Sequence, residues 1–218
     1  MVAEAVFSTG ALGTYCTTAD VLALLAGYDL TALGDVAAVE ARVMALLPVA
    51  MEAIDGAAGR DFRFHRGAQL RVDGTGGQTL SLAETGLVPI ISVSEVAMGG
   101  EAVALNRIVV GGDDGSLRLV PGDGGPVAFV QGTLNVEVTL DWGYLSPPSD
   151  ITTAQARLVA AELLTAVDGP VGTPESVRIG DYEVKYGGGG AHSDAVRALT
   201  EGARRIAARY RRPVLAAV

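Results

Sequence analysis

The sequence predicts an α+β protein in which helices from both chain ends form a bundle and a sandwich- or barrel-like antiparallel β-module is inserted between them. Apolar residues recur every three or four positions before residue 67, every second position from 67 to 142, and every three or four positions afterwards. Many of the 29 glycines stand where the period-two segment needs turns. The expected domains are N-terminal helices over 1–66, the β-module over 67–142, and C-terminal helices with a hairpin and an extended tail over 143–218.

Two helices are predicted before the β-module. The first spans 17–27, with Thr17 as its N-cap and the carboxylate three residues later as the reciprocal partner. The second spans 35–58, where Pro48 predicts a kink or a restart and Gly59 a C-terminal stop. Its expected buried face consists of Val36, Val39, Val43, Leu46, Ala50 and Ile54.

The β-module divides into four hairpin-like units. They read QLRVDGTGGQTLSL, ISVSEVAMGGEAVAL, RIVVGGDDGSLRLV and VAFVQGTLNVEVTLDW. The second is expected to turn at Gly99–Gly100 and the third within Gly111–Gly115. Four such units at this spacing are typical of a small antiparallel sandwich or barrel.

A stiff corner leads from the β-module back to helix. Gly143, Tyr144, Pro147 and Pro148 are expected to fix the exit angle, and Asp150 (or Ser149) to cap a helix over 151–167.

The C-terminal part continues with a hairpin, SVRIGDYEVKY, that is expected to turn at Gly180–Asp181. Four glycines at 187–190 follow as a predicted hinge. The last helix is expected over 193–211, with an inner seam of Val196, Leu199, Ala203, Ile206 and Tyr210.

Catalytic and metal-binding signatures are missing from the sequence. There is no nucleophile elbow, zinc-protease motif or phosphate-binding loop, and the carboxylates near Asp113–Gly115 lack the spacing of a calcium loop. His65 and His192 share no ligand spacing, and Cys16, the one cysteine, is expected to be a bystander thiol. The sequence therefore predicts no enzyme and no cofactor.

Net charge and hydropathy exclude several further classes of protein. The net charge of −9 argues against general affinity for nucleic acid or anionic membranes. The N-terminus lacks the basic region of a signal peptide, and no apolar run approaches the ~20 residues that span a bilayer. A protein made in a cytoplasm is expected.

Arginines gather on the last helix, on the side opposite the seam. These arginines form either an ordinary solvated helix face or a surface that binds an acidic partner. Both stay open at this point. The residues are Arg197, Arg204, Arg205, Arg209, Arg211 and Arg212.

The order of these elements resembles the head–tail connector, or adaptor, family of tailed double-stranded DNA bacteriophages and gene transfer agents. The likeness is carried by AIDGAAGRDF (53–62), ISVSEVAMGGEAV (91–103), VEVTLDWGYLSPPSDITTA (136–154) and RIGDYEVKYGG (178–188). In that family a helix ends in a Gly-Arg-x-Phe-like corner, here Gly59, Arg60 and Phe62, before the β-insert begins.

The resemblance implies a virion protein of the head–tail neck, made in the bacterial host cytoplasm, with the portal protein and a stopper or tail-completion protein as partners. It implies a ring of about twelve copies under the portal. DNA would pass through its lumen without specific binding, which an acidic balance favours. No membrane is expected to take part.

Two alternatives remain. The chain could be a stopper or tail-completion protein one layer further out, or its β-module could bind a carbohydrate or a host protein. For the connector, the last helix and the apolar tail containing Val214 and Leu215 are the expected portal-docking element.

Overall fold

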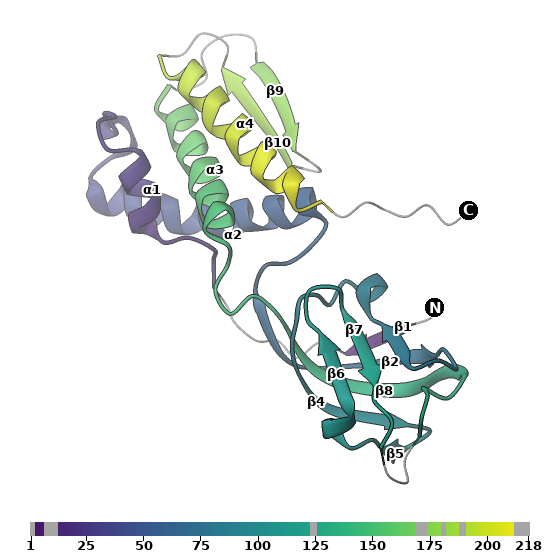
Figure 1. Cartoon of the computed structure of the whole chain (residues 1–218). Helices are drawn as coiled ribbons and strands as arrows, with labels where there is room; N and C mark the ends of the chain where they lie inside the picture. The colour runs from purple at the N-terminus through teal and green to yellow at the C-terminus, as the bar shows by residue number, and fades with distance from the viewer. Residues whose placement is uncertain are drawn as a thin grey trace. The chain divides into compact units, whose positions relative to one another are not determined.

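The computed structural model describes residues 3–6, 13–122, 126–168, 174–179, 182–187 and 191–211, and of the strands 3–6, 174–179 and 182–187 it describes the backbone alone. The chain divides into two compact units (Figure 1). A β unit contains Met1–Leu12 and Arg63–Ser146, and a helical unit contains Gly13–Phe62 and Pro147–Val218. The structure is therefore α+β, with helices and antiparallel sheets segregated along the chain.

The helical unit is arranged about one central helix. Helix α3 contacts α1, α2 and α4, and half of its residues are buried, which is typical of a helix covered on several sides (Figure 1). The elements are α1 (Thr18–Leu24), the 3-10 helix η1 (Thr31–Leu33), α2 (Val36–Ala58), α3 (Ser149–Asp168), the hairpin of β9 (Pro174–Ile179) and β10 (Tyr182–Gly187), and α4 (Ser193–Arg209).

Both predicted signals at the ends of the N-terminal helices are confirmed. Thr17 Oγ1 accepts from the Asp20 backbone N–H, and the Asp20 carboxylate accepts in return from the Thr17 N–H, which completes a capping box. The Asp20 carboxylate accepts from both the Thr17 N–H and the Thr17 hydroxyl, and these two bonds lower the pKa of Asp20. Gly59 ends α2 in the left-handed region, at φ 65°.

Helix α2 differs from the prediction on its buried face, and of the two outcomes expected at Pro48 the restart does not occur. It continues through Pro48 without a restart; Pro48 and Met44, whose carbonyl loses its helical partner, both lie on the exposed side, where water can replace that bond. Leu47 takes the buried place expected for Leu46, and Val36 is 73% exposed in the first turn. The other four expected face residues are buried.

The β unit contains two sheets. The first has the order β1-β2-β8-β4-β5, and the second the order β3-β7-β6. All pairs are antiparallel, and among the described residues the strands form no closed barrel. Both sheets contribute to one hydrophobic core. The strands are β1 (Ala3–Val6), β2 (Phe64–Gly74), β3 (Thr79–Ser81), β4 (Ile90–Met98), β5 (Glu101–Ala102), β6 (Ile108–Gly111), β7 (Ser116–Leu119) and β8 (Gly132–Gly143).

Two of the four expected hairpins are confirmed. Strands β4 and β5 turn at Gly99–Gly100, both at positive φ, and β6 pairs with β7 across the Gly-Asp-Asp-Gly turn. The C-terminal hairpin also forms, with Tyr182 opposite Ile179. Its turn residues and the tetraglycine positions 188–190 lie outside the described residues.

The other two expected hairpins are wrong. Strands β2 and β3 belong to different sheets, and the segment before β8 is not a strand. Instead, the N–H of Gly76 bonds the Phe129 carbonyl and the N–H of Phe129 bonds the Gly77 carbonyl, each at 2.8 Å. A Cβ on Gly74 would lie 1.7 Å from the Val130 carbonyl oxygen, so this crossing requires glycine. Strand β1, which pairs with β2, was not predicted.

The predicted corner after β8 spans the boundary between the units. Gly143 has φ 93°, and a Cβ there would meet the Arg63 carbonyl oxygen at 1.9 Å, so glycine is required. That carbonyl also accepts from the Tyr144 N–H. Pro147 begins the second segment of the helical unit, and the Pro148 carbonyl accepts from the N–H groups of the first turn of α3. That these residues set an exit angle stays a prediction.

Candidate partner-binding surface

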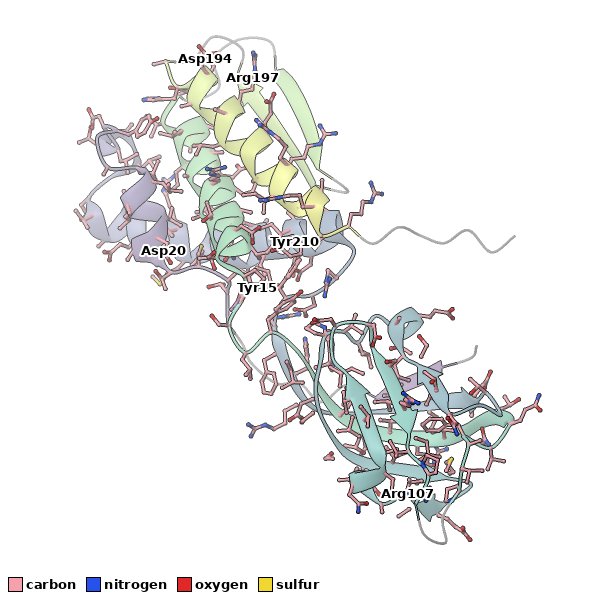
Figure 2. The ribbon with its side chains drawn as sticks, in the orientation of Figure 1. Tyr15, Asp20, Arg107, Asp194, Arg197 and Tyr210 are labelled. Atoms are coloured by element: carbon pink, nitrogen blue, oxygen red, sulfur yellow. The ribbon has the colours of Figure 1, made fainter. Side chains whose placement is uncertain are left out.

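The arginines of α4 form two separate rows along the helix, here called the first and the second stripe. At ~100° per residue, Arg205 and Arg209 share one exposed side of the helix, while Arg197 and Arg204 lie about a third of a turn away. Arg211 follows the helix, which ends at Arg209. All five are exposed. Arg212, Val214 and Leu215 lie outside the described residues. Figure 2 shows Arg197 near the start of α4 and Tyr210 just past its end.

The inner seam of α4 is largely as predicted. Val196, Ala203 and Ile206 are buried, and Thr200 and Ala207 join them. Leu199 and Tyr210, expected in the seam, are half-buried. These contacts hold α4 against α3 and α2, so the helix is part of the core of its unit.

A groove of about 750 Å³ runs beside the first stripe. Its floor is apolar, and three guanidinium groups lie along it. Gly202 leaves space for one of them, because a Cβ at that position would lie 2.4 Å from Arg157 Nη1. The lining residues are Leu24 of α1, Arg157 of α3, and Ala198, Leu199, Gly202, Arg205, Ile206 and Arg209 of α4.

Asp150 joins the beginning of α3 to the end of α4. Its carboxylate accepts from the Tyr210 hydroxyl at 2.7 Å and lies 3.2 Å from Arg209 Nη2. The helix begins at Ser149, so Asp150 stands in the first turn rather than at the expected N-cap, although Oδ1 also accepts from the Ile151 N–H. Capping patterns in the sequence reveal only local partners, so they could not identify Tyr210, which lies 60 residues away.

Replacing Asp150 with alanine should lower the free energy of unfolding of the helical unit by about 1–2 kcal/mol. Most of the loss comes from the Tyr210 hydrogen bond, because the exposed ion pair to Arg209 contributes little. Chemical denaturation measures the change. Tyr210→Phe should cost a similar amount in the wild type and nothing in the Asp150→Ala variant; additive losses would contradict the link.

Phe62 packs against Tyr210, the hydrogen-bond partner of Asp150. It is fully buried and makes edge-on ring contacts with Tyr15 and Tyr210, at 5.8 and 5.1 Å between centroids. The Arg60 guanidinium lies 5.5 Å from the Phe62 ring centroid. The Gly-Arg-x-Phe corner is therefore a packing motif in this chain.

Tyr15 holds the segment before α1 against the same corner. Its hydroxyl donates to Asp55 Oδ1 at 2.6 Å and accepts from the Phe62 N–H at 3.0 Å. Burial, and then the bond to Asp55, raise the pKa of Tyr15 above its ordinary value, so the phenol stays neutral across the physiological range. No sequence pattern marked this residue.

Gln155 forms a second buried link. It is fully buried: its Oε1 accepts from the Cys16 N–H at 2.6 Å, and its Nε2 donates to the Leu47 carbonyl at 2.7 Å. Burial raises the pKa of the Cys16 thiol to about 12, so at neutral pH it is a thiol and not a nucleophilic thiolate.

The two histidines lie in separate units and have structural contacts. His192 Nδ1 lies 2.7 Å from Asp168 Oδ1, and the backbone N–H of His192 donates to the same carboxylate. These contacts connect the start of α4 to the end of α3. His65 stacks on Trp142 at 4.1 Å. Within the described part of the chain, no group of three or more His, Cys, Asp or Glu could hold a metal.

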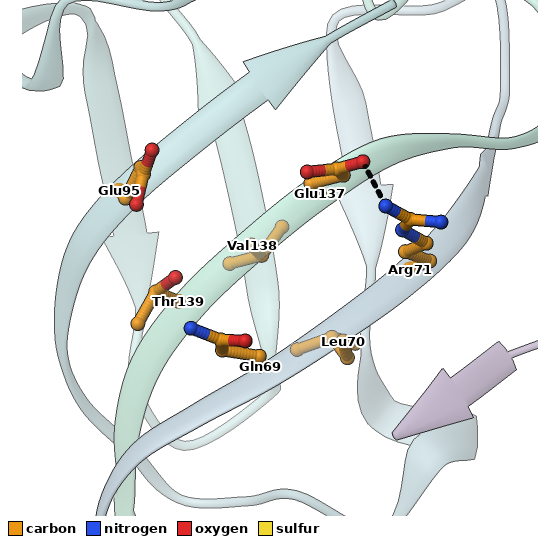
Figure 3. A pocket seen from close by; sticks show the side chains of 7 residues that line it. All are labelled: Gln69, Leu70, Arg71, Glu95, Glu137, Val138 and Thr139. Atoms are coloured by element: carbon orange, nitrogen blue, oxygen red, sulfur yellow. Dashed lines mark ion pairs between the residues drawn. The ribbon is translucent and has the colours of Figure 1, made fainter. Parts of the chain in front are cut away.

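A small hollow of about 290 Å³ lies on the exposed face of the five-stranded sheet (Figure 3). Arg71 and Glu137 form an exposed ion pair across it at 2.7 Å. None of its lining residues is aromatic, so it lacks the rings on which sugars stack. They are Gln69, Leu70, Arg71, Glu95, Glu137, Val138 and Thr139.

These units define an α+β fold in which a helical unit carries an antiparallel β unit. The same fold occurs in the neck of an empty gene transfer agent particle computed with C6 symmetry, with 18% identity, 98% coverage of both chains and a TM-score of 0.52. Chains of a native gene transfer agent virion and of a native neck computed with C12 symmetry cover the same share at 18% and 19% identity, with TM-scores of 0.48 and 0.47. No protein-family model and no curated protein matches the sequence. Among the described residues no helix has the length and hydropathy to span a bilayer.

Proposed function

We propose that this protein is a head–tail connector of a tailed bacteriophage or gene transfer agent particle. It assembles as a ring under the portal and extends the DNA channel toward the tail. The supporting observation is the fold shared with a neck chain over 98% of both lengths. A connector works by holding its neighbours in place, so the role needs no catalytic group.

The charge balance supports passage of DNA. A conduit with basic walls would bind phosphate and retain the genome, whereas a chain of net charge −9 repels it. In the same proposal the two sheets of the β unit pack as a sandwich, and the helices form the bundle that contacts neighbouring proteins.

The portal-docking element is proposed to be the second stripe of α4, which contains Arg197 and Arg204, together with Arg211, Arg212 and the tail residues Val214 and Leu215. Exposed guanidinium groups in a row suit a carboxylate-rich surface and accelerate the encounter with it. Because Arg209 pairs with Asp150 and Arg205 lines the groove, these two arginines belong to a different surface.

The proposed function is tested by mixing the purified chain with the portal of its own particle and measuring the mass of the product. The expected result is the portal plus a ring of about a dozen copies. A chain that binds the far side of the neck and ignores the portal would be a stopper or tail-completion protein instead, and the connector proposal would then be wrong.

The docking stripe is tested by charge reversal. Truncation before α4 is unsuitable, because it removes the buried residues Val196, Ala203 and Ile206 from the core. Arg204→Glu should instead slow association with the portal about tenfold at low salt and leave folding unchanged. Arg118→Glu, at an exposed position of β7 in the β unit, is the matched control. Wild-type association by the Arg204→Glu variant would place the portal contact elsewhere.

A further inference from the structure

The groove beside Arg205 combines features that point to a protein partner. Its floor is formed by Leu24, Leu199 and Ile206, and its positive charge comes from three arginines. An occupant needs an apolar side to cover this floor and carboxylates to meet the guanidinium groups.

One exposed helix face of this same chain has that composition. Met44 is 59% exposed and Val49 is 42% exposed, and both lie on the outward side of α2 with Pro48 between them. Ala37, Ala41 and Ala45 are exposed on this side as well. The face ends in Glu52, and Glu40 lies at its edge.

The charges of the two surfaces are opposite. From residue 29 to residue 52 the exposed ionisable side chains are four carboxylates and one arginine, Arg42. Along the groove the ionisable side chains are the half-buried Arg157 and the exposed Arg205 and Arg209, and of these Arg209 already pairs with Asp150. Complementary charge sets the register between two surfaces that both bury apolar area.

The two surfaces cannot meet within one copy. Helix α2 buries Val43, Leu47 and Ile54 toward α3 and α4, so Met44 and Val49 point away from the helices that form the groove. A contact between different faces of identical chains is head-to-tail, and repeated contacts of this kind close into a ring when the rotation allows it.

We propose that the groove formed by α1, α3 and α4 receives the outward face of α2 from a neighbouring copy of this chain. Met44 and Val49 cover the apolar floor, Glu52 faces Arg205, and Glu40 faces Arg157. The proposal rests on the proposed function, in which copies form a ring, and it identifies the two surfaces that join them.

Cysteine cross-linking of the full chain tests this contact. Met44→Cys marks the α2 face and Ala198→Cys marks the groove; both positions are exposed, whereas native Cys16 is buried and does not compete. A short bismaleimide should give dimers when the two single variants are mixed and none with either variant alone. A chain carrying both cysteines should give a ladder of higher multimers.

Charge reversal supplies the matched control. Arg205→Glu should reduce the cross-linked yield at least about tenfold, and Arg204→Glu, one residue away on the other stripe, should leave it unchanged. Adding Glu52→Arg to the Arg205→Glu chain should restore the yield.

The outcomes separate this contact from the connector role. A ring on the portal without cross-links, or dimers from a single variant alone, would overturn the proposed contact and leave the ring intact. Equal yields from Arg205→Glu and Arg204→Glu would overturn it as well. A ladder that depends on Arg205, formed by a chain that ignores the portal, would support the contact and contradict the connector role.

Discussion

Replacing Phe62 with alanine should lower the free energy of unfolding of the helical unit by about 3–5 kcal/mol, the largest effect expected of a single substitution in this unit. The side chain is fully buried, and its removal leaves a cavity between Tyr15, Tyr210 and the end of α2. The edge-on ring contacts are lost in addition to the buried area.

Thermal or denaturant unfolding followed by circular dichroism at the helix signal measures this change. Tyr28→Ala is the matched control, because Tyr28 is an aromatic residue of the same unit that is 37% exposed, and its loss should cost about 1 kcal/mol or less. Equal costs for the two variants would show that the corner is not a packing centre.

Replacing Gln155 with leucine should cost about 2–4 kcal/mol, although leucine is the more hydrophobic residue. Leucine fills similar space but leaves the buried Cys16 N–H without an acceptor and removes the donor to the Leu47 carbonyl. An unpaired buried polar group is more costly than the net gain from a hydrogen bond.

The same unfolding measurement applies, with Thr153→Ala on the exposed side of the same helix as control, expected to cost about 0.5 kcal/mol. Hydrogen exchange gives a second readout, since the Cys16 amide should lose protection in the Gln155→Leu variant before the unit unfolds globally. An unchanged rate of exchange at Cys16 would contradict the bridge.

Structural features that depend on a local sequence pattern were predicted correctly. The capping box at Thr17, the stop at Gly59, the turn at Gly99–Gly100 and the buried residues of α4 all follow from spacing within a few positions. Where the outcome depended on pairing across the chain, prediction failed. Strands β2 and β3 look like a hairpin by sequence, but their partners are β8 and β7.

Only part of the arrangement of the α4 surface follows from the sequence. The spacing of the arginines along α4 separates them into two stripes, but which stripe lies beside a groove depends on how α1 and α3 pack against the helix. The groove could not be predicted, because Arg157 and Leu24 reach it from other helices. The role of Asp150 was missed for the same reason: its partner Tyr210 lies 60 positions away.

The first strand has a consequence for how the chain avoids aggregation. Strand β1 pairs with residues 69–72, so it covers four of the eleven residues along one side of strand β2. Without it, the backbone donors and acceptors along that side of β2 would be a free edge beside an apolar core, able to recruit strands from other molecules. Four residues of β1 therefore shield the middle of an edge that β2 would otherwise present.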